Sequence, residues 1–258
     1  MKTYVMGNWK MNLTVGDASI YLQRLLKKVK PVRGLEIIIA PSLISLPSLS
    51  LQLERNKSKI KLAAQNFYQK DFGAFTGEVS IAQLRGVVSY AIIGHSERRF
   101  IFGETNKDIS QKVAAAIRSG ITPVLCIGET ENQRNFGETK DVLRDEILGG
   151  FSEIDTEDVK KCLLAYEPVW AISSTKQARP AVPDEIAESV KIIKTQLAGI
   201  YDQETVDAIP LIYGGSVNPN NAGAYLTIPG INGLMIGESS LISDNFNDII
   251  EVAKRVRD

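Results

Sequence analysis

Short apolar runs alternate with amphipathic stretches along the whole chain. Eight of these runs are apolar at successive positions, which is typical of strands buried on both faces of a parallel sheet. The predicted strands cover residues 4–7, 35–40, 61–64, 90–93, 123–127, 163–165, 211–213 and 234–236. The sequence therefore predicts a parallel sheet with helices packed on its faces.

The stretches between these runs have helical spacing. Apolar residues recur at intervals of three or four positions within 18–29, 109–117, 186–197 and 246–253, as expected of amphipathic helices. Pro31 and Gly120 end the first two, and Pro183 suits the first turn of the third. Eight strand signals in 258 residues give about 32 residues per unit, close to the ~30 of one βα repeat.

The regular alternation, without a linker or a change of composition, predicts one domain that covers residues 1–258. Alternation alone leaves two architectures open, a doubly wound open sheet and a closed (β/α)8 barrel. A barrel gathers the loops that follow its strands at one mouth, whereas an open sheet spreads them along an edge. Because polar residues suited to chemistry follow five of the eight strands, we expect a single (β/α)8 barrel.

Composition narrows the function classes. Thirty Lys and Arg balance thirty Asp and Glu, so no overall field attracts nucleic acid or a membrane surface. The first ten residues lack the apolar core of a signal peptide, and no apolar run approaches the ~18 residues of a membrane span. Cys126 and Cys162 stand in apolar runs without a CxxC pair, which predicts buried, reduced thiols. We therefore expect a cytoplasmic protein.

Two candidate catalytic residues follow the fourth and sixth strands. His95 is the only histidine, and Ser96 can begin a short helix whose positive end disfavours an imidazolium. A neutral imidazole there can donate a hydrogen bond to a substrate oxygen. Glu167 ends an apolar strand, where a partly desolvated carboxylate suits the removal of a proton from carbon. A hydrogen-bonded structural histidine and a solvated strand-end carboxylate are the more common alternatives when each residue is considered alone.

Candidate anion-binding residues follow the first and seventh strands. Lys10, close to Asn8, is either a surface lysine or a cation that offsets negative charge on a substrate. The segment 214–216 (GGS) precedes a helix expected to begin near Pro219, so its backbone N–H groups can bind an anion. Taken alone, this segment is more often a turn. The loops after strands seven and eight are nevertheless the usual phosphate site of barrel enzymes.

Four motifs occur in a fixed order along the chain. They are NWK at 8–10, GHSERR at 94–99, YEPVWAI at 166–172 and YGGSV at 213–217. Together they resemble the triosephosphate isomerase family, and the resemblance covers essentially the whole chain. It implies a TIM barrel and a cofactor-independent aldose–ketose isomerase that acts on a small sugar phosphate in glycolysis and gluconeogenesis.

The resemblance also implies roles for single residues. Glu167 matches the general base that moves a proton between adjacent carbons, and His95 matches the neutral electrophile that polarises the carbonyl. Asn8 and Lys10 match the pair that contacts the substrate. The implied phosphate contacts are Asn8, Lys10, Ser173, Ser216, Gly237 and Glu238. The implied first hinge of a mobile lid is Pro168, Val169 and Trp170.

Residues 65–80 form a long, aromatic and weakly periodic stretch. It resembles the loop through which members of the family interlock, with Gln65 at its start and Thr76 reaching the active site of a partner, so we expect a homodimer. The alternative is a loop packed on its own barrel. No Gly-rich dinucleotide fingerprint is present, and a lone histidine excludes a multi-histidine metal site. We therefore expect neither a cofactor nor a metal.

The chain departs from the family in two places. After Ile172 the family's lid reads Gly-Thr-Gly-Lys-Thr-Ala, whereas this chain has SSTKQA at 173–178. Aligning the next helix through Pro183 places the second hinge at 179–181 and adds three residues to the lid, so Ser173 replaces a glycine. Glu238 stands where the family has a second glycine beside phosphate, and a carboxylate near a dianion is costly.

These departures leave the substrate open between two isomerase hypotheses. The first is interconversion of glyceraldehyde 3-phosphate and dihydroxyacetone phosphate, which the complete motifs favour. The second is isomerisation of four-carbon erythrulose phosphates (L-erythrulose 1-phosphate or D-erythrulose 4-phosphate), as in a divergent branch of the family that serves polyol catabolism. A third hypothesis, a catalytically silent barrel that only binds phosphorylated ligands, conflicts with the intact set of Asn8, Lys10, His95 and Glu167.

Overall fold

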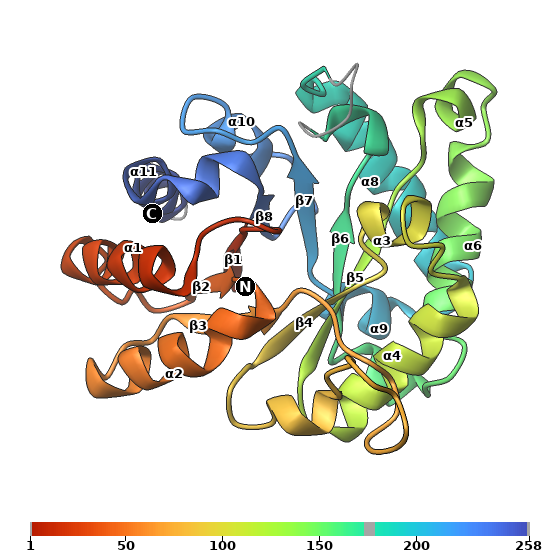
Figure 1. Cartoon of the computed structure of the whole chain (residues 1–258). Helices are drawn as coiled ribbons and strands as arrows, with labels where there is room; N and C mark the ends of the chain where they lie inside the picture. The colour runs from red at the N-terminus through yellow and green to blue at the C-terminus, as the bar shows by residue number, and fades with distance from the viewer. Residues whose placement is uncertain (1, 173–178, 257–258) are drawn as a thin grey trace.

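Eight parallel strands close into a barrel in sequence order, and β8 pairs with β1 (Figure 1). The computed structural model describes residues 2–172 and 179–256. The strands are β1 Thr3–Asn8, β2 Leu35–Ala40, β3 Lys61–Ala64, β4 Tyr90–Ile93, β5 Thr122–Ile127, β6 Leu163–Tyr166, β7 Leu211–Gly215 and β8 Gly233–Ile236. All eight predicted strands lie within these bounds, and the predicted (β/α)8 barrel, a TIM barrel, is confirmed.

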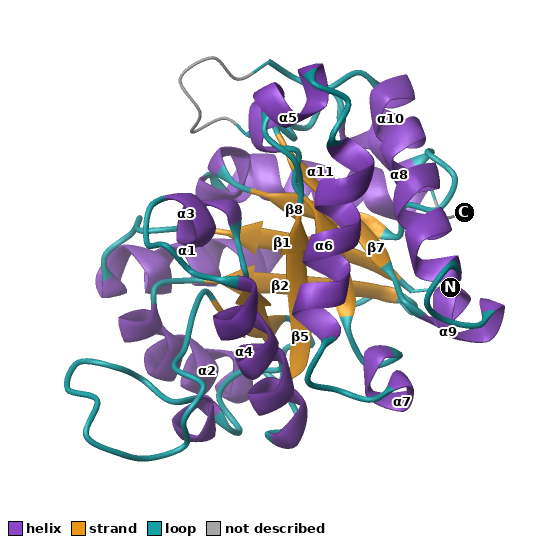
Figure 2. Ribbon diagram, turned by 90° about the vertical axis from the view of Figure 1, so that its right-hand side faces the viewer, coloured by secondary structure: helices purple, strands orange, loops and turns teal. Residues whose placement is uncertain are grey.

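The helices surround the strands (Figure 2). They are α1 Val15–Lys28, α2 Leu46–Arg55, α3 Ser96–Phe100, α4 Asn106–Arg118, α5 Glu131–Asn135, α6 Thr139–Phe151, α7 Thr156–Val159, α8 Pro183–Ala198, α9 Gln203–Ala208, α10 Ala222–Leu226 and α11 Ser243–Arg255. Four 3-10 helices are η1 Leu43–Ser45, η2 Ile81–Leu84, η3 Val169–Ala171 and η4 Glu238–Leu241. The four predicted helices correspond to α1, α4, α8 and α11.

One predicted helix start is wrong. The helix expected near Pro219 begins at Ala222 instead. The side-chain oxygen of Asn218 accepts the backbone N–H groups of Asn220 and Asn221, at 2.9 and 3.2 Å. These bonds hold the backbone in a turn, because an Asn side chain offers N–H groups an alternative to helical hydrogen bonds.

The strands are buried on both faces, which explains why they are apolar at successive positions. Val5 and Met6, neighbours in β1, are both fully buried but belong to different clusters. Met6 lies inside the barrel, and Val5 lies between the barrel and the helices. The interior cluster comprises Tyr4, Met6, Ile38, Ala40, Ala63, Tyr90, Ile92, Val124, Cys126, Leu163, Ala165, Ile212 and Met235. Layers of side chains from alternate strands fill such a barrel, so its interior is a packed core and the sites of barrel enzymes lie at the carboxyl ends of the strands.

Two further features follow the sequence predictions. Cys126 and Cys162 are buried free thiols. Within the described part of the chain, no helix is long and apolar enough to cross a membrane.

Candidate active site

His95 and Glu167 face each other at the carboxyl ends of the strands. His95 Nε2 lies 3.3 Å from Glu167 Oε1, and each side chain is 6% exposed. They line one cavity together with Asn8, Lys10, Ile172, Gly214, Gly215, Met235 and Gly237. The predicted side chains follow three different strands, β1, β4 and β6, and they share one pocket because closure of the barrel brings these strand ends together.

Gly94 and the start of α3 set the orientation of His95. The backbone φ at Gly94 is +69°, and a Cβ there would lie 2.9 Å from Ile109 Cδ1, so only glycine fits. His95 is the N-cap of α3, and its Nδ1 accepts the backbone N–H of Glu97 at 3.2 Å. Because Nδ1 accepts this bond, the proton of a neutral ring is on Nε2, which faces Glu167.

Lys10 is held in the left-handed region, with φ +51°. Its backbone N–H donates to Asn8 Oδ1 at 3.1 Å, and Gln65 Nε2 donates to the carbonyls of Lys10 and Ala40, both at 2.8 Å. Its Nζ lies 2.7 Å from Glu97 Oε1. Such backbone strain, about 1–3 kcal/mol, persists only where surrounding bonds fix it. Gln65, predicted for the dimer loop, thus also supports the site of its own chain.

Glu167 combines burial with an unused acceptor. Its backbone N–H donates to the carbonyl of Ile127 at 2.8 Å, which ties the start of the loop to the end of β5. Its Oε2 is buried and has no hydrogen-bond partner among residues 2–172 and 179–256. A desolvated carboxylate oxygen without a donor is costly in a resting protein and suited to accept a proton from a ligand.

The predicted phosphate contacts are only partly assembled in the structure. Gly237 lines the cavity, but Ser216 and Glu238 lie beside lining residues without lining it themselves. The N–H and Oγ of Ser216 both donate to the carbonyl of Ala171, at 2.9 Å each. Glu238 is exposed at the start of η4, and Ser173 lies outside the described residues.

Comparison with known proteins shows the family to which the chain belongs. A sequence model of the family described as triosephosphate isomerase matches residues 3–253. The chain belongs to the triosephosphate isomerase family. It is accordingly an isomerase of the intramolecular oxidoreductase type.

Three similar proteins bear the name triosephosphate isomerase. The one from Natranaerobius thermophilus is 35% identical over 255 residues, which cover 98% of this chain and 97% of that protein. The one from Carboxydothermus hydrogenoformans is 38% identical over 251 residues, which cover 97% of this chain and 98% of that protein. The one from Chlamydia trachomatis serovar L2 is 39% identical over 257 residues, which cover 97% of this chain and 89% of that protein.

In this isomerase the predicted lid hinge is bonded to a buried carboxylate that the sequence analysis missed. Pro168 precedes η3, and the backbone N–H of Val169 donates to the carbonyl of Glu129 at 3.0 Å. Trp170 Nε1 donates to Glu129 Oε1 at 3.0 Å, and the Tyr166 hydroxyl lies 3.2 Å from it. Glu129 is fully buried, so these donors replace the water that it lost.

Two arginines flank the hinge tryptophan. The guanidinium carbons of Arg134 and Arg179 lie 5.0 and 4.5 Å from the centroid of the Trp170 ring, within cation–π range. Arg179 also binds Glu185 in α8 through two nitrogens, at 2.9 and 2.6 Å. This hydrogen-bonded pair lowers the pKa of Glu185 to about 2. The two ends of the predicted lid are therefore joined through Trp170 and Arg179.

Residues 65–80 leave the barrel as a loop that extends past α4 (Figure 1). Thr76 and Phe72 are exposed, the latter by 86%. Further large apolar side chains are exposed near this end of the molecule: Met11, Ile44, Phe100, Ile101 and Phe102. So many exposed apolar side chains are unusual for an isolated monomer.

Cys126 also reaches the site, although the sequence analysis treated it as an ordinary buried thiol. Together with Glu167 and Gly128 it lines a small void behind the carboxylate. Burial, and then the negative charge of Glu167, raise the pKa of the Cys126 thiol, so the thiol stays protonated beside the carboxylate. Cys126 stands two positions after Val124 in β5, and both side chains point into the barrel. This alternation is the signal from which sequence reasoning could have placed Cys126 inside the barrel.

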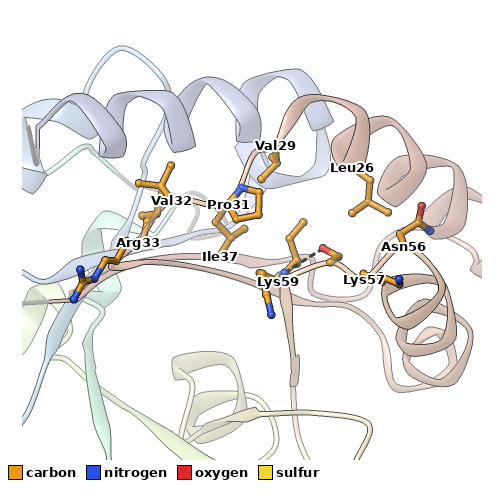
Figure 3. A pocket seen from close by; sticks show the side chains of 12 residues that line it. Leu26, Val29, Pro31, Val32, Arg33, Ile37, Asn56, Lys57 and Lys59 are labelled. Atoms are coloured by element: carbon orange, nitrogen blue, oxygen red, sulfur yellow. Dashed lines mark hydrogen bonds between the residues drawn. The ribbon is translucent and has the colours of Figure 1, made fainter.

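A second cavity, of about 510 Å³, lies near the amino ends of β2 and β3 (Figure 3). Leu26, Val29 and Ile37 form part of its apolar wall, and Figure 3 shows the Arg33 side chain extending away from them. The cavity lies at the end of the barrel opposite His95 and Glu167. Within the described residues no group of three His, Cys, Asp or Glu has metal-binding geometry.

Proposed function

We propose that the chain interconverts glyceraldehyde 3-phosphate and dihydroxyacetone phosphate through an enediolate. The observation that carries the proposal is the buried carboxylate–imidazole pair of Glu167 and His95, 3.3 Å apart in one cavity. The family membership and the name shared by the three relatives support the same substrate pair. Glycolysis and gluconeogenesis, in the cytoplasm, are then the expected setting.

The proposed chemistry moves one proton between two carbons and one between their oxygens, and it needs no cofactor. The Glu167 carboxylate takes a proton from the carbon next to the carbonyl, and the Nε2–H of His95 donates a hydrogen bond to the oxygen on which negative charge develops. Glu167 then returns its proton to the neighbouring carbon, which was the carbonyl carbon. The hydroxyl proton of the enediolate passes to the other oxygen by way of His95 Nε2, so that the former hydroxyl becomes the new carbonyl. The unpartnered, buried Oε2 of Glu167 supports this role, because no donor in the described chain must be displaced before it accepts a proton.

The remaining predicted residues bind the substrate in this proposal. The Lys10 ammonium, held by the Asn8 and Gln65 hydrogen bonds to its backbone, offsets negative charge on the substrate. Backbone N–H groups at Ser173, Gly237 and Glu238 hold the phosphate, and the N–H of Ser216 joins them once it releases the carbonyl of Ala171. The hinge of Pro168, Val169 and Trp170 lets the lid exclude water.

Glu238 supports a second candidate, the isomerisation of erythrulose phosphates. Its side chain is exposed next to Gly237, which lines the cavity, and no hydrogen-bond or ion-pair partner for it is found among the described residues. A carboxylate near a phosphate dianion weakens binding unless the substrate offers it a hydroxyl. A four-carbon substrate carries one more hydroxyl than a triose phosphate, so this position favours the longer substrate.

We further propose that the chain is one domain, residues 1–258, and forms a homodimer. The pairing of β8 with β1 supports one domain, because the two ends of the chain complete the same sheet. The exposed apolar side chains of the 65–80 loop, Met11, Ile44 and 100–102 support association. Sedimentation equilibrium tests the dimer, and Phe72→Asp should shift it toward monomer. A monomeric wild-type protein at micromolar concentration would contradict this part of the proposal.

A side-by-side coupled assay of triose and erythrulose phosphates tests the substrate. Higher kcat/KM with glyceraldehyde 3-phosphate supports the first candidate, and the reverse order supports the second. Activity with neither substrate would overturn both.

Deuterium exchange tests the proton transfer directly. Incorporation of solvent deuterium into a substrate C–H bond is expected, and Glu167→Gln should abolish it. Glu188→Gln, which neutralises an exposed carboxylate on α8, is the matched control and should leave exchange unchanged. Persistent exchange in Glu167→Gln would reject Glu167 as the base.

A further inference from the structure

Glu146 is a buried carboxylate on α6 with two partners near the active site. It is 9% exposed. Its Oε2 accepts the backbone N–H of Gly128 at 2.7 Å, and its Oε1 lies 3.5 Å from Arg99 Nε. Both partners follow the carboxyl ends of strands, Gly128 directly after β5 and Arg99 in the short helix α3 after β4, whereas Glu146 belongs to a helix of the outer layer. The carboxylate therefore links the outer layer of the barrel to its mouth.

Arg99 extends this link to the loop of the catalytic histidine. Its Nε donates to the carbonyl of Gly94, the residue before His95, at 2.8 Å, and one Nη donates to the carbonyl of Cys126 at 3.1 Å. Its other Nη donates to Asn106 at 2.8 Å. With 10% of its side chain exposed, Arg99 depends on these acceptors and on Glu146 for its charge.

Gly128 extends the link to the catalytic carboxylate. The residue is packed against the backbone of Glu167 so closely that a Cβ would lie 2.1 Å from the Glu167 carbonyl oxygen. The preceding carbonyl, of Ile127, accepts the Glu167 backbone N–H. A shift of Gly128 is therefore transmitted to Glu167 through direct contact.

We propose that Glu146 is a positioning residue of the isomerisation: ionised, it holds Arg99 and the Gly128 N–H, and through them the loops of His95 and Glu167. The proposal rests on the catalytic roles proposed above for those two residues. Glu146 bridges α6 to the strand ends that carry His95 and Glu167. Among the described ion pairs, no other charged residue of α6 contacts either strand end.

Glu146 ionises within the pH range in which an enzyme is usually assayed. Burial, together with the smaller effects of the Glu129 and Glu167 charges, raises its pKa to about 7, against the lowering effects of Arg99 and the Gly128 N–H. Charged or titratable groups of the surrounding elements are Arg99 on α3, Cys126 on β5, Glu129 and Glu167 after β5 and β6, Arg134 on α5, and Glu185 and Glu188 on α8. Protonation below neutral pH neutralises the partner of Arg99 and loosens the bridge.

The experiment compares kcat and KM of wild type and Glu146→Gln across about pH 5.5 to 8.5, with the better of the two substrates. Gln keeps the length of the side chain and its acceptor for Gly128 but removes the charge. The wild-type kcat should rise through about pH 7, and the variant should lack this step. At the upper pH the variant kcat should be about tenfold lower at unchanged KM, since small displacements of catalytic groups are costly.

Asp145→Asn is the matched control, because it removes an exposed charge from the adjacent position of the same helix. It should retain the wild-type step in kcat. A merely structural role of Glu146 would lower the melting temperature of Glu146→Gln without removing the step. If the variant fails to fold, the wild-type profile decides alone: a kcat that is flat from about pH 5.5 to 8.5 overturns the proposal.

Equal kcat of Glu146→Gln and wild type at the upper pH also overturns it. Either result leaves the proposed isomerase function intact, provided that Glu167→Gln still loses deuterium exchange. Conversely, if Glu167→Gln exchanges normally, the proposed role of Glu167 as the base fails whatever Glu146→Gln shows. The two failures are therefore distinguishable.

Discussion

Replacing Gly128 by alanine tests whether the placement of Glu167 limits the reaction. The added Cβ would lie 2.1 Å from the Glu167 carbonyl oxygen and 2.5 Å from its carbonyl carbon. Nonbonded carbon and oxygen atoms rarely approach below roughly 3 Å, so one of the two backbones must move by about 1 Å. Neither group is the end of a flexible side chain, so a rotamer change cannot relieve the contact.

The displacement acts on the residue that carries the proposed base. A misplacement of about 1 Å at a catalytic group costs on the order of 100-fold in rate. We therefore expect kcat of Gly128→Ala to fall about 100-fold, while KM changes little because most of the proposed phosphate contacts follow β1, β7 and β8, away from Gly128. Overpacking of this kind also lowers the free energy of unfolding by about 1–3 kcal/mol, which chemical denaturation measures.

Gly199→Ala is the matched control. It adds the same methyl group at the C-cap of α8, where the nearest atom outside its neighbours is 3.4 Å away. This variant should keep the wild-type kcat and stability. A Gly128→Ala enzyme that is destabilised as expected but retains the wild-type kcat would refute the reasoning, because the backbone of Glu167 would then tolerate displacement without cost to catalysis.

Three further predictions concern buried or exposed carboxylates. The pKa of Glu146 is raised to about 7, against 4.5 for an ordinary glutamate. The stability that this shift contributes is fully present below about pH 4.5 and is lost as the pH rises to about 7. Relative to wild type, Glu146→Gln should therefore gain up to about 3 kcal/mol of unfolding free energy between about pH 5 and pH 8, measured by urea titration. Trp170→Phe removes a donor from the fully buried Glu129 and should lower the free energy of unfolding by about 1–3 kcal/mol in the same assay. Glu238→Gly removes a carboxylate beside the proposed phosphate contacts and should lower the inhibition constant of inorganic phosphate about fivefold, with Glu153→Gly as a distant exposed control.

The strands and the main site residues were predictable because each depends on a local pattern. A strand buried on both faces must be apolar at successive positions, so even the four-residue runs 61–64 and 90–93 coincide with β3 and β4. His95 and Glu167 were found because a polar residue directly after such a run has few structural reasons to be there. The start of α10 was missed because the Asn218 side chain, and not Pro219, determines where the turn ends.

The residues that support the site were not predicted, and Glu146 shows why. It stands between Asp145 and Ile147 in a stretch rich in charge, which is typical of a solvated helix face. Its helical phase contains the missed signal: Leu143, Ile147 and Gly150 are buried with it at intervals of three and four residues. A carboxylate within an apolar stripe predicts a buried partner, but only the folded chain identifies that partner as Arg99.

Three buried carboxylates near the ends of β5 and β6 differ in how many hydrogen-bond donors and cations they contact. Glu129 accepts hydrogen bonds from Trp170, Arg134 and the Tyr166 hydroxyl. Glu146 receives one backbone N–H and one distant guanidinium, and its pKa rises to about 7. Glu167 has the imidazole of His95 on one oxygen and no hydrogen-bond donor on the other among the described residues. Of the three, Glu167 is the one that lines the cavity beside His95, and there its unpartnered oxygen can accept a proton from a substrate carbon.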